Sequence, residues 1–272
     1  MTNRKLLALP YIFWALFFII FPLLLIIGYA FSNGDGGITL SNVLAIFDKT
    51  NSKALLMSLE IALACTVICI LLAYPLAMIL RKINVNKNSF MTLIVILPMW
   101  MNFVLRILAW KMILSQNGII NNIFESLGLP LIDIINTPAA IIIGSVYDFL
   151  PYMILPIYNS LMAIDDDLID AAKDLGANWF NVLRKIIIPL TVPGIVSGVS
   201  MVFVPSMTSF VISDILGGGK VQLIGNIIEQ EFTQSMNWDL GSGLSVALMA
   251  FVLASMFFVQ KNDEMDKGNQ IW

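Results

Sequence analysis

Long apolar runs alternate with short polar segments along the 272-residue chain, and this alternation predicts its elements. A helix needs about 20 mostly apolar residues to cross the hydrocarbon core of a bilayer. Runs of this kind lie near residues 6–31, 54–80, 90–114, 138–163, 186–213 and 242–260. We therefore expect an all-α integral membrane protein, with six transmembrane helices in a single domain over residues 1–272.

The composition agrees with a membrane protein and excludes several kinds of chemistry. Hydrophobic residues make up 58% of the chain and charged residues only 12%, whereas soluble domains carry about 25% charged residues. The net charge of −3 gives no basic field for nucleic acid. The chain has no histidine, which excludes the usual zinc sites and Ser–His or Cys–His catalysis. We expect no metal site, and we interpret Cys65 and Cys69 as small packing residues.

Lysine and arginine predict the orientation of the helices, because cytoplasmic loops carry an excess of both. If both termini are cytoplasmic, the inner segments hold Arg4, Lys5, Arg81, Lys82, Lys87, Lys173, Arg184, Lys185, Lys261 and Lys267. The outer segments then hold only Lys49, Lys53 and Lys220. This asymmetry predicts that the segment 164–189, between the fourth and fifth runs, faces the cytoplasm.

The segment 164–189 is more polar than the runs on either side of it. Asp165 to Asp167 offer capping oxygens and favourable charge at a helix start. Leu168, Ile169, Ala172 and Leu175 follow at helical spacing. Gly176 is suited to end this helix in a left-handed conformation, and Asn178 to cap the next one. From these residues alone, an interfacial helical hairpin and a docking loop remain equally open.

A motif in this segment resembles the loop E-A-A-x3-G-x9-I-x-L-P of ABC-importer permeases. The residues that carry the resemblance are Asp170, Ala171, Ala172, Gly176, Ala177, Ile186, Ile188 and Pro189. Asp170 replaces the glutamate of the motif, and Ile188 replaces the leucine. The resemblance implies the type I importer permease fold, in which this loop forms a coupling helix that inserts into a groove on an ATPase subunit.

Further stretches, among them "LPMWMNFVLRILAWKMIL" and "LPYMILPIYNSL", are similar to the PotB-type permease subunits of spermidine/putrescine importers. This resemblance implies a bacterial cytoplasmic membrane location and a polyamine substrate. It implies as partners an ABC ATPase in two copies, a second, PotC-type permease subunit and an extracellular or periplasmic polyamine-binding protein. It also implies a transport subunit that is no enzyme and binds no cofactor, with ATP and Mg²⁺ on the ATPase.

The sequence Gly217–Lys220 lacks the first glycine and the Ser or Thr of a phosphate-binding loop, so we interpret it as a turn.

Charged residues within apolar runs cost about 2.5–3.5 kcal/mol each at the middle of the bilayer, and so they indicate function. Polyamines are multivalent cations that fit spaced carboxylates and aromatic faces. The candidate pathway residues are Glu60, Tyr147, Asp148, Tyr152 and Asp214. Arg106 offers another explanation, because a buried arginine needs a counter-ion, and Asp148 or Glu60 would supply one.

The sequence leaves two other functions open. The loop motif also occurs in ABC permeases for other solutes, so the substrate rests on the wider resemblance. A self-sufficient channel or secondary transporter is the second alternative, against which stand the docking loop and the lack of an evident internal repeat.

Overall fold

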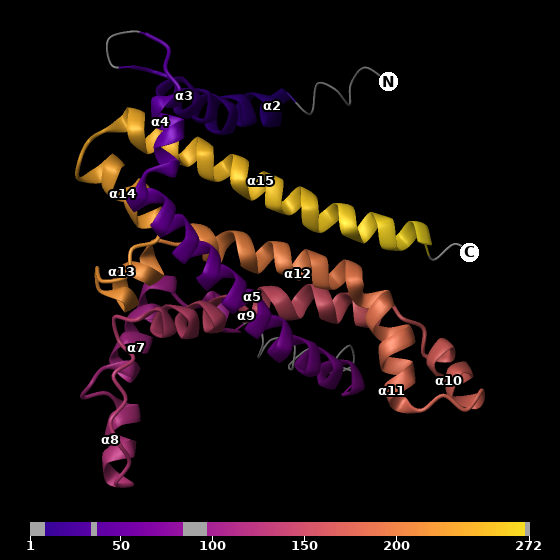
Figure 1. Ribbon diagram of the computed structural model, residues 1–272. Coiled ribbons are helices and arrows are strands. Elements are labelled where there is room, and N and C mark those ends of the chain that lie inside the picture. The colour runs from indigo at the N-terminus through magenta and orange to yellow at the C-terminus, as the bar shows by residue number, and fades with distance from the viewer. Residues whose placement is uncertain (1–8, 34–36, 84–96, 270–272) are drawn as a thin grey trace. The chain divides into compact units, whose positions relative to one another are not determined.

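The computed structural model describes residues 9–33, 37–83 and 97–269, and these are helical apart from turns, loops and one isolated bridge between Ser32 and Ile38 (Figure 1). Within these residues, six helices are long and apolar enough to cross a membrane. They are Pro10–Ala30, Lys49–Lys82, Phe103–Ser126, Pro138–Met162, Trp179–Thr208 and Trp238–Phe257. The prediction of an all-α protein with six membrane helices is confirmed.

The chain divides into two compact units, each of which draws on distant parts of the sequence. The first unit comprises residues 1–55 and 224–254, and the second comprises residues 56–223 and 255–272. One permease domain over residues 1–272 stays a prediction.

The first unit contains the first membrane helix and most of the last. Its elements are α2 (Leu9–Ala15), the π-helical turn η1 (Leu16–Ile20), α3 (Phe21–Ala30), α4 (Ser41–Leu44), η2 (Ala45–Phe47), the start of α5 (Lys49–Lys82), α14 (Ile224–Thr233) and most of α15 (Trp238–Asn269). The end of α3 is fixed by Asn42, whose Nδ2 donates to the carbonyls of Ala30 at 3.3 Å and Ser32 at 2.8 Å. Large side chains of the first membrane helix, such as Phe13, remain exposed in this chain.

The second unit holds the elements of both candidate sites. They are the rest of α5, α7 (Phe103–Leu114), α8 (Ile119–Ser126), α9 (Pro138–Met162), α10 (Asp166–Asp174), α11 (Trp179–Val182), η4 (Leu183–Ile187), α12 (Ile188–Thr208) and α13 (Val211–Gly217). Helices α9 and α12 run side by side, and α10 and α11 lie together at one end of this pair (Figure 1). Gly194 makes this approach possible, because a Cβ there would lie 2.6 Å from the Pro156 carbonyl oxygen.

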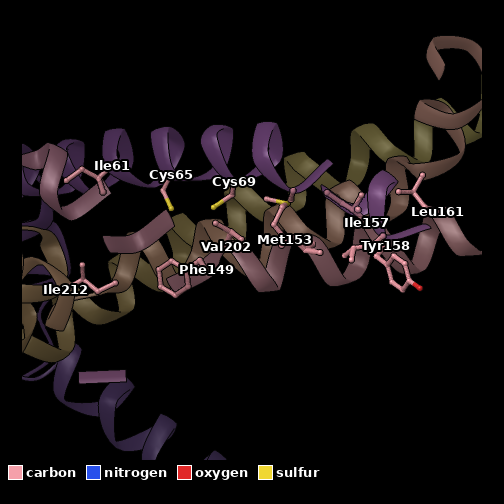
Figure 2. Packing of buried hydrophobic residues seen from close by; sticks show 14 of the residues in the cluster. Ile61, Cys65, Cys69, Phe149, Met153, Ile157, Tyr158, Leu161, Val202 and Ile212 are labelled. Atoms are coloured by element: carbon pink, nitrogen blue, oxygen red, sulfur yellow. The ribbon is translucent and has the colours of Figure 1, made fainter. Parts of the chain in front are cut away.

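Apolar side chains from α5, α9, α12 and α13 form the core of the second unit (Figure 2). Cys65 and Cys69 point into this core from α5, and both are fully buried free thiols. Met153 and Val202 lie close to them from α9 and α12. The two cysteines therefore act as small core residues, as the sequence predicts.

The structure corrects the predicted boundaries of two membrane helices. Part of the third predicted span, residues 90–96, lies outside the described residues. The chain is helical over residues 97–100, leaves the helix at 101–102, and α7 then begins at Phe103. The side chain of Asn102 caps this new start by accepting from the Leu105 amide at 3.2 Å. The fifth predicted span, 186–213, is likewise two helices, because Ser209 is extended and separates α12 from α13.

Candidate coupling loop and intramembrane charge site

The candidate coupling loop, residues 164–189, is built around the short helix α10, which begins at an aspartate cap. Asp165 has an extended backbone, and its Oδ1 accepts a hydrogen bond from the Asp167 amide at 3.1 Å. Asp166 and Asp167 lie in the first turn and Lys173 in the last, so all three charges interact favourably with the helix dipole. Local sequence therefore determines where this helix starts, as predicted.

Gly176 ends α10 in the left-handed conformation that the sequence predicts. Its φ is +83°, and its amide donates to the Lys173 carbonyl at 2.8 Å. The Ala177 amide donates to the Ala172 carbonyl at 3.0 Å, which completes a Schellman motif. Asn178 then caps α11, since its Oδ1 accepts from the Asn181 amide at 2.8 Å. Two rigid caps thus set the path of the chain between α10 and the fifth membrane helix.

The residues of the motif divide between two faces of the loop. Ala172 packs against the core of the second unit, as Ile169 does, so this side of α10 faces its own protein. Asp170, Ala171 and Gly176 are exposed, whereas Ala177, Ile186 and Pro189 are half-buried. Of the two neighbouring alanines, only Ala171 is exposed, because Ala172 turns toward the core.

Apolar side chains that the sequence analysis did not assign to a binding face are also exposed on this loop. The side chain of Leu175 is 90% exposed, and those of Leu168, Trp179 and Phe180 are about half exposed or more. Leu175 and Gly176 lie next to each other, and nothing lies within 4 Å of a Cβ built on Gly176. The helix end therefore presents a small apolar surface with open space around it, which is suited to contact another protein.

Arg81, in the last turn of α5, holds the start of this loop. Its Nη2 donates to the Ile164 carbonyl at 2.9 Å and to Asp166 Oδ1 at 2.7 Å. A cavity of about 680 Å³ lies beside this contact, between the ends of α5 and α9 and the loop. The loop is thus fixed at the Arg81 contact but is incompletely packed beneath α10.

A buried ion pair joins the third and fourth membrane helices. Arg106 Nη2 on α7 lies 2.6 Å from Asp148 Oδ1 on α9, and the two side chains are only 6% and 5% exposed. The structure thus assigns Asp148, rather than Glu60, as the counter-ion of Arg106. Removing one partner of such a pair leaves an uncompensated buried charge.

Arg106 also contacts the break in the third membrane helix. Its Nη1 donates to the Pro98 carbonyl at 2.6 Å, so one guanidinium joins the helical residues 97–100 to α9. Backbone that leaves the helix at membrane depth needs such partners, because no water is available there. In the described part of the chain, Arg106 Nε and Asp148 Oδ1 have no hydrogen-bond partner of good geometry.

The other candidate pathway residues lie apart from this pair. Tyr147 packs edge-to-face on Trp110 with ring centroids 5.3 Å apart, and Tyr152 lies beside Phe149 at 6.5 Å. Glu60 and Asp214 are exposed on α5 and α13, and no ion pair of either is found among the described residues. The structure therefore brings together Asp148 and Arg106, while Glu60, Tyr152 and Asp214 remain accessible at the surface of this chain.

The sequence Gly217–Lys220 forms the end of α13 and not a phosphate-binding loop. Gly218 has a φ of +54°, and its amide donates to the Asp214 carbonyl at 3.1 Å. This is a left-handed helix end followed by a turn, as predicted.

Residues 70–261 match the family described as "Binding-protein-dependent transport system inner membrane component". The chain belongs to this family. The matched range contains the whole candidate coupling loop, Arg106 and Asp148. The loop and the ion pair therefore both lie in the part of the chain that matches the family.

Curated relatives extend the match over most of the permease. It is 39% identical over 254 residues to the "Spermidine/putrescine transport system permease protein PotB" of Haemophilus influenzae, covering 90% of this chain and 88% of that protein. It is 38% identical over 254 residues to PotB of Escherichia coli (strain K12), covering 90% and 92% of the two chains. Both alignments span nearly the full length of each protein.

Solved structures of ABC importers share the fold of the permease. One is a bacterial ABC transporter involved in the import of the acidic polysaccharide alginate, with a TM-score of 0.77, 18% identity and coverage of 97% and 95% of the two chains. A second is the alginate transporter in complex with an alginate pentasaccharide-bound periplasmic protein, with a TM-score of 0.77 and 18% identity over 94% and 92% of the two chains. The permease therefore has the type I importer fold.

Proposed function

We propose that the permease is the PotB-type subunit of an ATP-driven importer of spermidine and putrescine. The observation that carries this proposal is the identity of 39% over nearly the whole of a spermidine/putrescine permease. The partners would be an ABC ATPase in two copies, a second, PotC-type permease subunit and an extracellular or periplasmic polyamine-binding protein. The chain would lie in the bacterial cytoplasmic membrane with both termini in the cytoplasm.

This subunit would have no ATPase site and bind no cofactor, with ATP and Mg²⁺ held by the partner ATPase. This proposal is supported at Gly217–Lys220, where the Gly218 and Lys220 amides donate to the Asp214 and Gly217 carbonyls and the sequence lacks the first glycine and the Ser or Thr of a phosphate-binding loop. Energy from ATP would instead reach the permease through protein contact.

The candidate coupling loop would make this contact through the exposed end of α10. Ala171, Leu175 and Gly176 face outward, while Ile169 and Ala172 anchor the helix to its own core. Asp170 is exposed and paired with Lys173 at 2.8 Å, so it is available at the edge of the same surface. A small apolar surface with a charged edge is typical of docking between subunits.

The substrate pathway would use carboxylates and aromatic rings of the second unit. Glu60, Tyr152 and Asp214 are accessible, whereas Tyr147 and Asp148 lie deeper beside Trp110 and Arg106. Accessible acids would attract a polyamine, and aromatic faces would contact its ammonium groups.

The substrate is tested by reconstituting the complete importer in proteoliposomes and measuring ATPase stimulation by binding proteins loaded with different solutes. We expect stimulation and uptake with putrescine or spermidine. An importer for another solute is the alternative, because the same fold occurs in an alginate transporter. Uptake of a neutral or anionic solute, with none of polyamines, would overturn the proposed substrate.

The docking surface is tested by Ala171→Arg, which adds a long charged side chain at its centre. We expect this variant to insert normally, to lose the ATPase in pull-downs from membranes and to lose uptake. Ser126→Arg, at an exposed small residue of α8, is the matched control and should retain both. Gly176→Trp should also prevent docking, although its φ of +83° adds backbone strain. Normal uptake in both loop variants at equal expression would reject the docking assignment.

A further inference from the structure

Two acceptor groups converge on one cation at the break in the third membrane helix. We propose that the Pro98 carbonyl and the Asp148 carboxylate form a binding site for a substrate ammonium group, and that Arg106 occupies this site until the substrate displaces it. The inference rests on the proposed polyamine transport, and it names the residues that would bind the substrate within the membrane.

The geometry around Arg106 is that of a cation site. Its two terminal nitrogens, Nη1 and Nη2, each lie 2.6 Å from an oxygen, one from the Pro98 carbonyl and one from the Asp148 carboxylate. Pro98 belongs to the helical residues 97–100, just before the chain leaves the helix. Carbonyls at such interrupted helix ends carry partial negative charge, and transporters use them to coordinate cations. A carboxylate on the neighbouring helix supplies the full charge.

The resident guanidinium satisfies this site only in part. Arg106 Nε and Asp148 Oδ1 lack a hydrogen bond of good geometry within the described residues. An alkylammonium group has three donors and no fixed plane, so it can direct its hydrogen bonds to both oxygens. The ammonium is therefore a chemically suitable replacement for Arg106.

Charge balance makes the exchange selective for cations. Asp148 is buried, and its carboxylate would be uncompensated if Arg106 moved away without a replacement. An arriving ammonium supplies that compensation, whereas a neutral solute does not. The exchange therefore needs a cation at Asp148, and the displaced Arg106 guanidinium, which keeps its charge, must move to water or to another acceptor.

An aromatic pair lies next to the site on the same two helices. Trp110 is four residues from Arg106 on α7, and Tyr147 precedes Asp148 on α9. Their rings meet edge-to-face with centroids 5.3 Å apart. Residues four apart on a helix share a face, so Trp110 lies one turn along α7 from the guanidinium. The pair offers apolar and π-electron surface for the methylene chain and second ammonium of a polyamine.

The site is tested by thermal unfolding of the purified importer complex without its binding protein, with putrescine as the probe. Arg106→Gln leaves Asp148 without its cation, so the variant should unfold at a lower temperature than the wild type, and putrescine should raise this temperature. At a putrescine concentration 100-fold above the dissociation constant, the ratio of folded to unfolded complex should rise about 100-fold. The wild type should respond less, because Arg106 competes for the site.

Three controls separate this site from a purely structural ion pair. The double variant Arg106→Gln, Asp148→Asn should be more stable than Arg106→Gln and should not respond to putrescine. Lys111→Gln removes an exposed cation of the same helix and should behave as the wild type. The uncharged analogue 1,4-butanediol should stabilise none of the proteins.

A lack of stabilisation of Arg106→Gln by putrescine, or an equal response of the double variant, would overturn the site. If Arg106→Gln does not assemble, Arg106→Lys provides the test, since the shorter side chain reaches the two oxygens less well. This variant should then be stabilised by putrescine more than the wild type, and an equal response would also overturn the site. Putrescine uptake by the wild-type importer is measured in parallel. No uptake would reject the proposed function, whereas uptake without stabilisation of the variants would reject only this site.

Discussion

Arg81 should control how firmly the candidate coupling loop is held to the end of α5. Its side chain is 15% exposed and donates to the Ile164 carbonyl at 2.9 Å and to Asp166 Oδ1 at 2.7 Å. A partly buried hydrogen bond from a charged group contributes about 1.5–3 kcal/mol. Asp166 is 86% exposed, and a pair with such a partner contributes about 0–1 kcal/mol. Most of the stabilisation is therefore expected to come from the carbonyl contact.

These values predict a clear difference between two substitutions. Arg81→Gln should destabilise the attached loop by about 1.5–3 kcal/mol, and so increase the detached population roughly 10- to 150-fold. Asp166→Asn should cost less than about 1 kcal/mol, an increase of at most about fivefold. Hydrogen–deuterium exchange of the α10 amides in the purified complex measures this population, because these amides exchange when the loop opens.

Lys82→Gln is the matched control, since Lys82 is the exposed neighbouring cation and no ion pair of it is found among the described residues. It should leave exchange in α10 unchanged. If Asp166→Asn accelerates exchange as much as Arg81→Gln, the carbonyl contact is not what holds the loop. If neither substitution changes exchange, Arg81 does not hold the loop at all.

Three further predictions concern the ion pair, the orientation and the end of α10. Asp148→Asn alone should destabilise the assembled permease by about 3–5 kcal/mol, and adding Arg106→Gln should restore most of this stability. The yield of intact complex measures both effects, and an equally low yield from the double variant and from Asp148→Asn would contradict the pairing. A cysteine at Asn178 should react with an impermeant thiol reagent only from the cytoplasmic side, and one at Asn237 only from outside; the opposite pattern would invert the topology. Gly176→Ala should cost about 1–2 kcal/mol because its φ is +83°, which melting of the purified complex would detect.

Sequence alone predicts the features of this protein that depend on local chemistry. Asp165, Gly176 and Asn178 cap their helices as expected, because capping depends on neighbours within a few residues. The six membrane helices follow from apolar length, and the cost of a charge in an apolar run draws attention to Arg106 and Asp148.

Features that depend on tertiary contacts are less accessible from the sequence. The break before Phe103 is only two residues long, so a hydropathy window averages it with the apolar residues on either side and does not reveal it. The local signal for the break is Asn102, a residue type that caps helix starts. Helical spacing places Ala172 and Leu175 in one apolar stripe, but only packing decides that Ala172 turns inward and Leu175 outward. The hydrogen bond from Arg81 to the Ile164 carbonyl joins residues far apart in the chain, and no local pattern indicates it.

The ion pair between the third and fourth membrane helices also has a consequence for biosynthesis. Arg106 leaves the ribosome before Asp148, and an arginine in a membrane helix costs free energy during insertion, about 2.5–3.5 kcal/mol at the helix centre and less near an end. The third helix, interrupted near Asn102 and carrying Arg106, is therefore a poor substrate for the translocon by itself. It should remain at the protein-conducting channel until the fourth helix arrives, and the two should enter the lipid together with Arg106 and Asp148 paired.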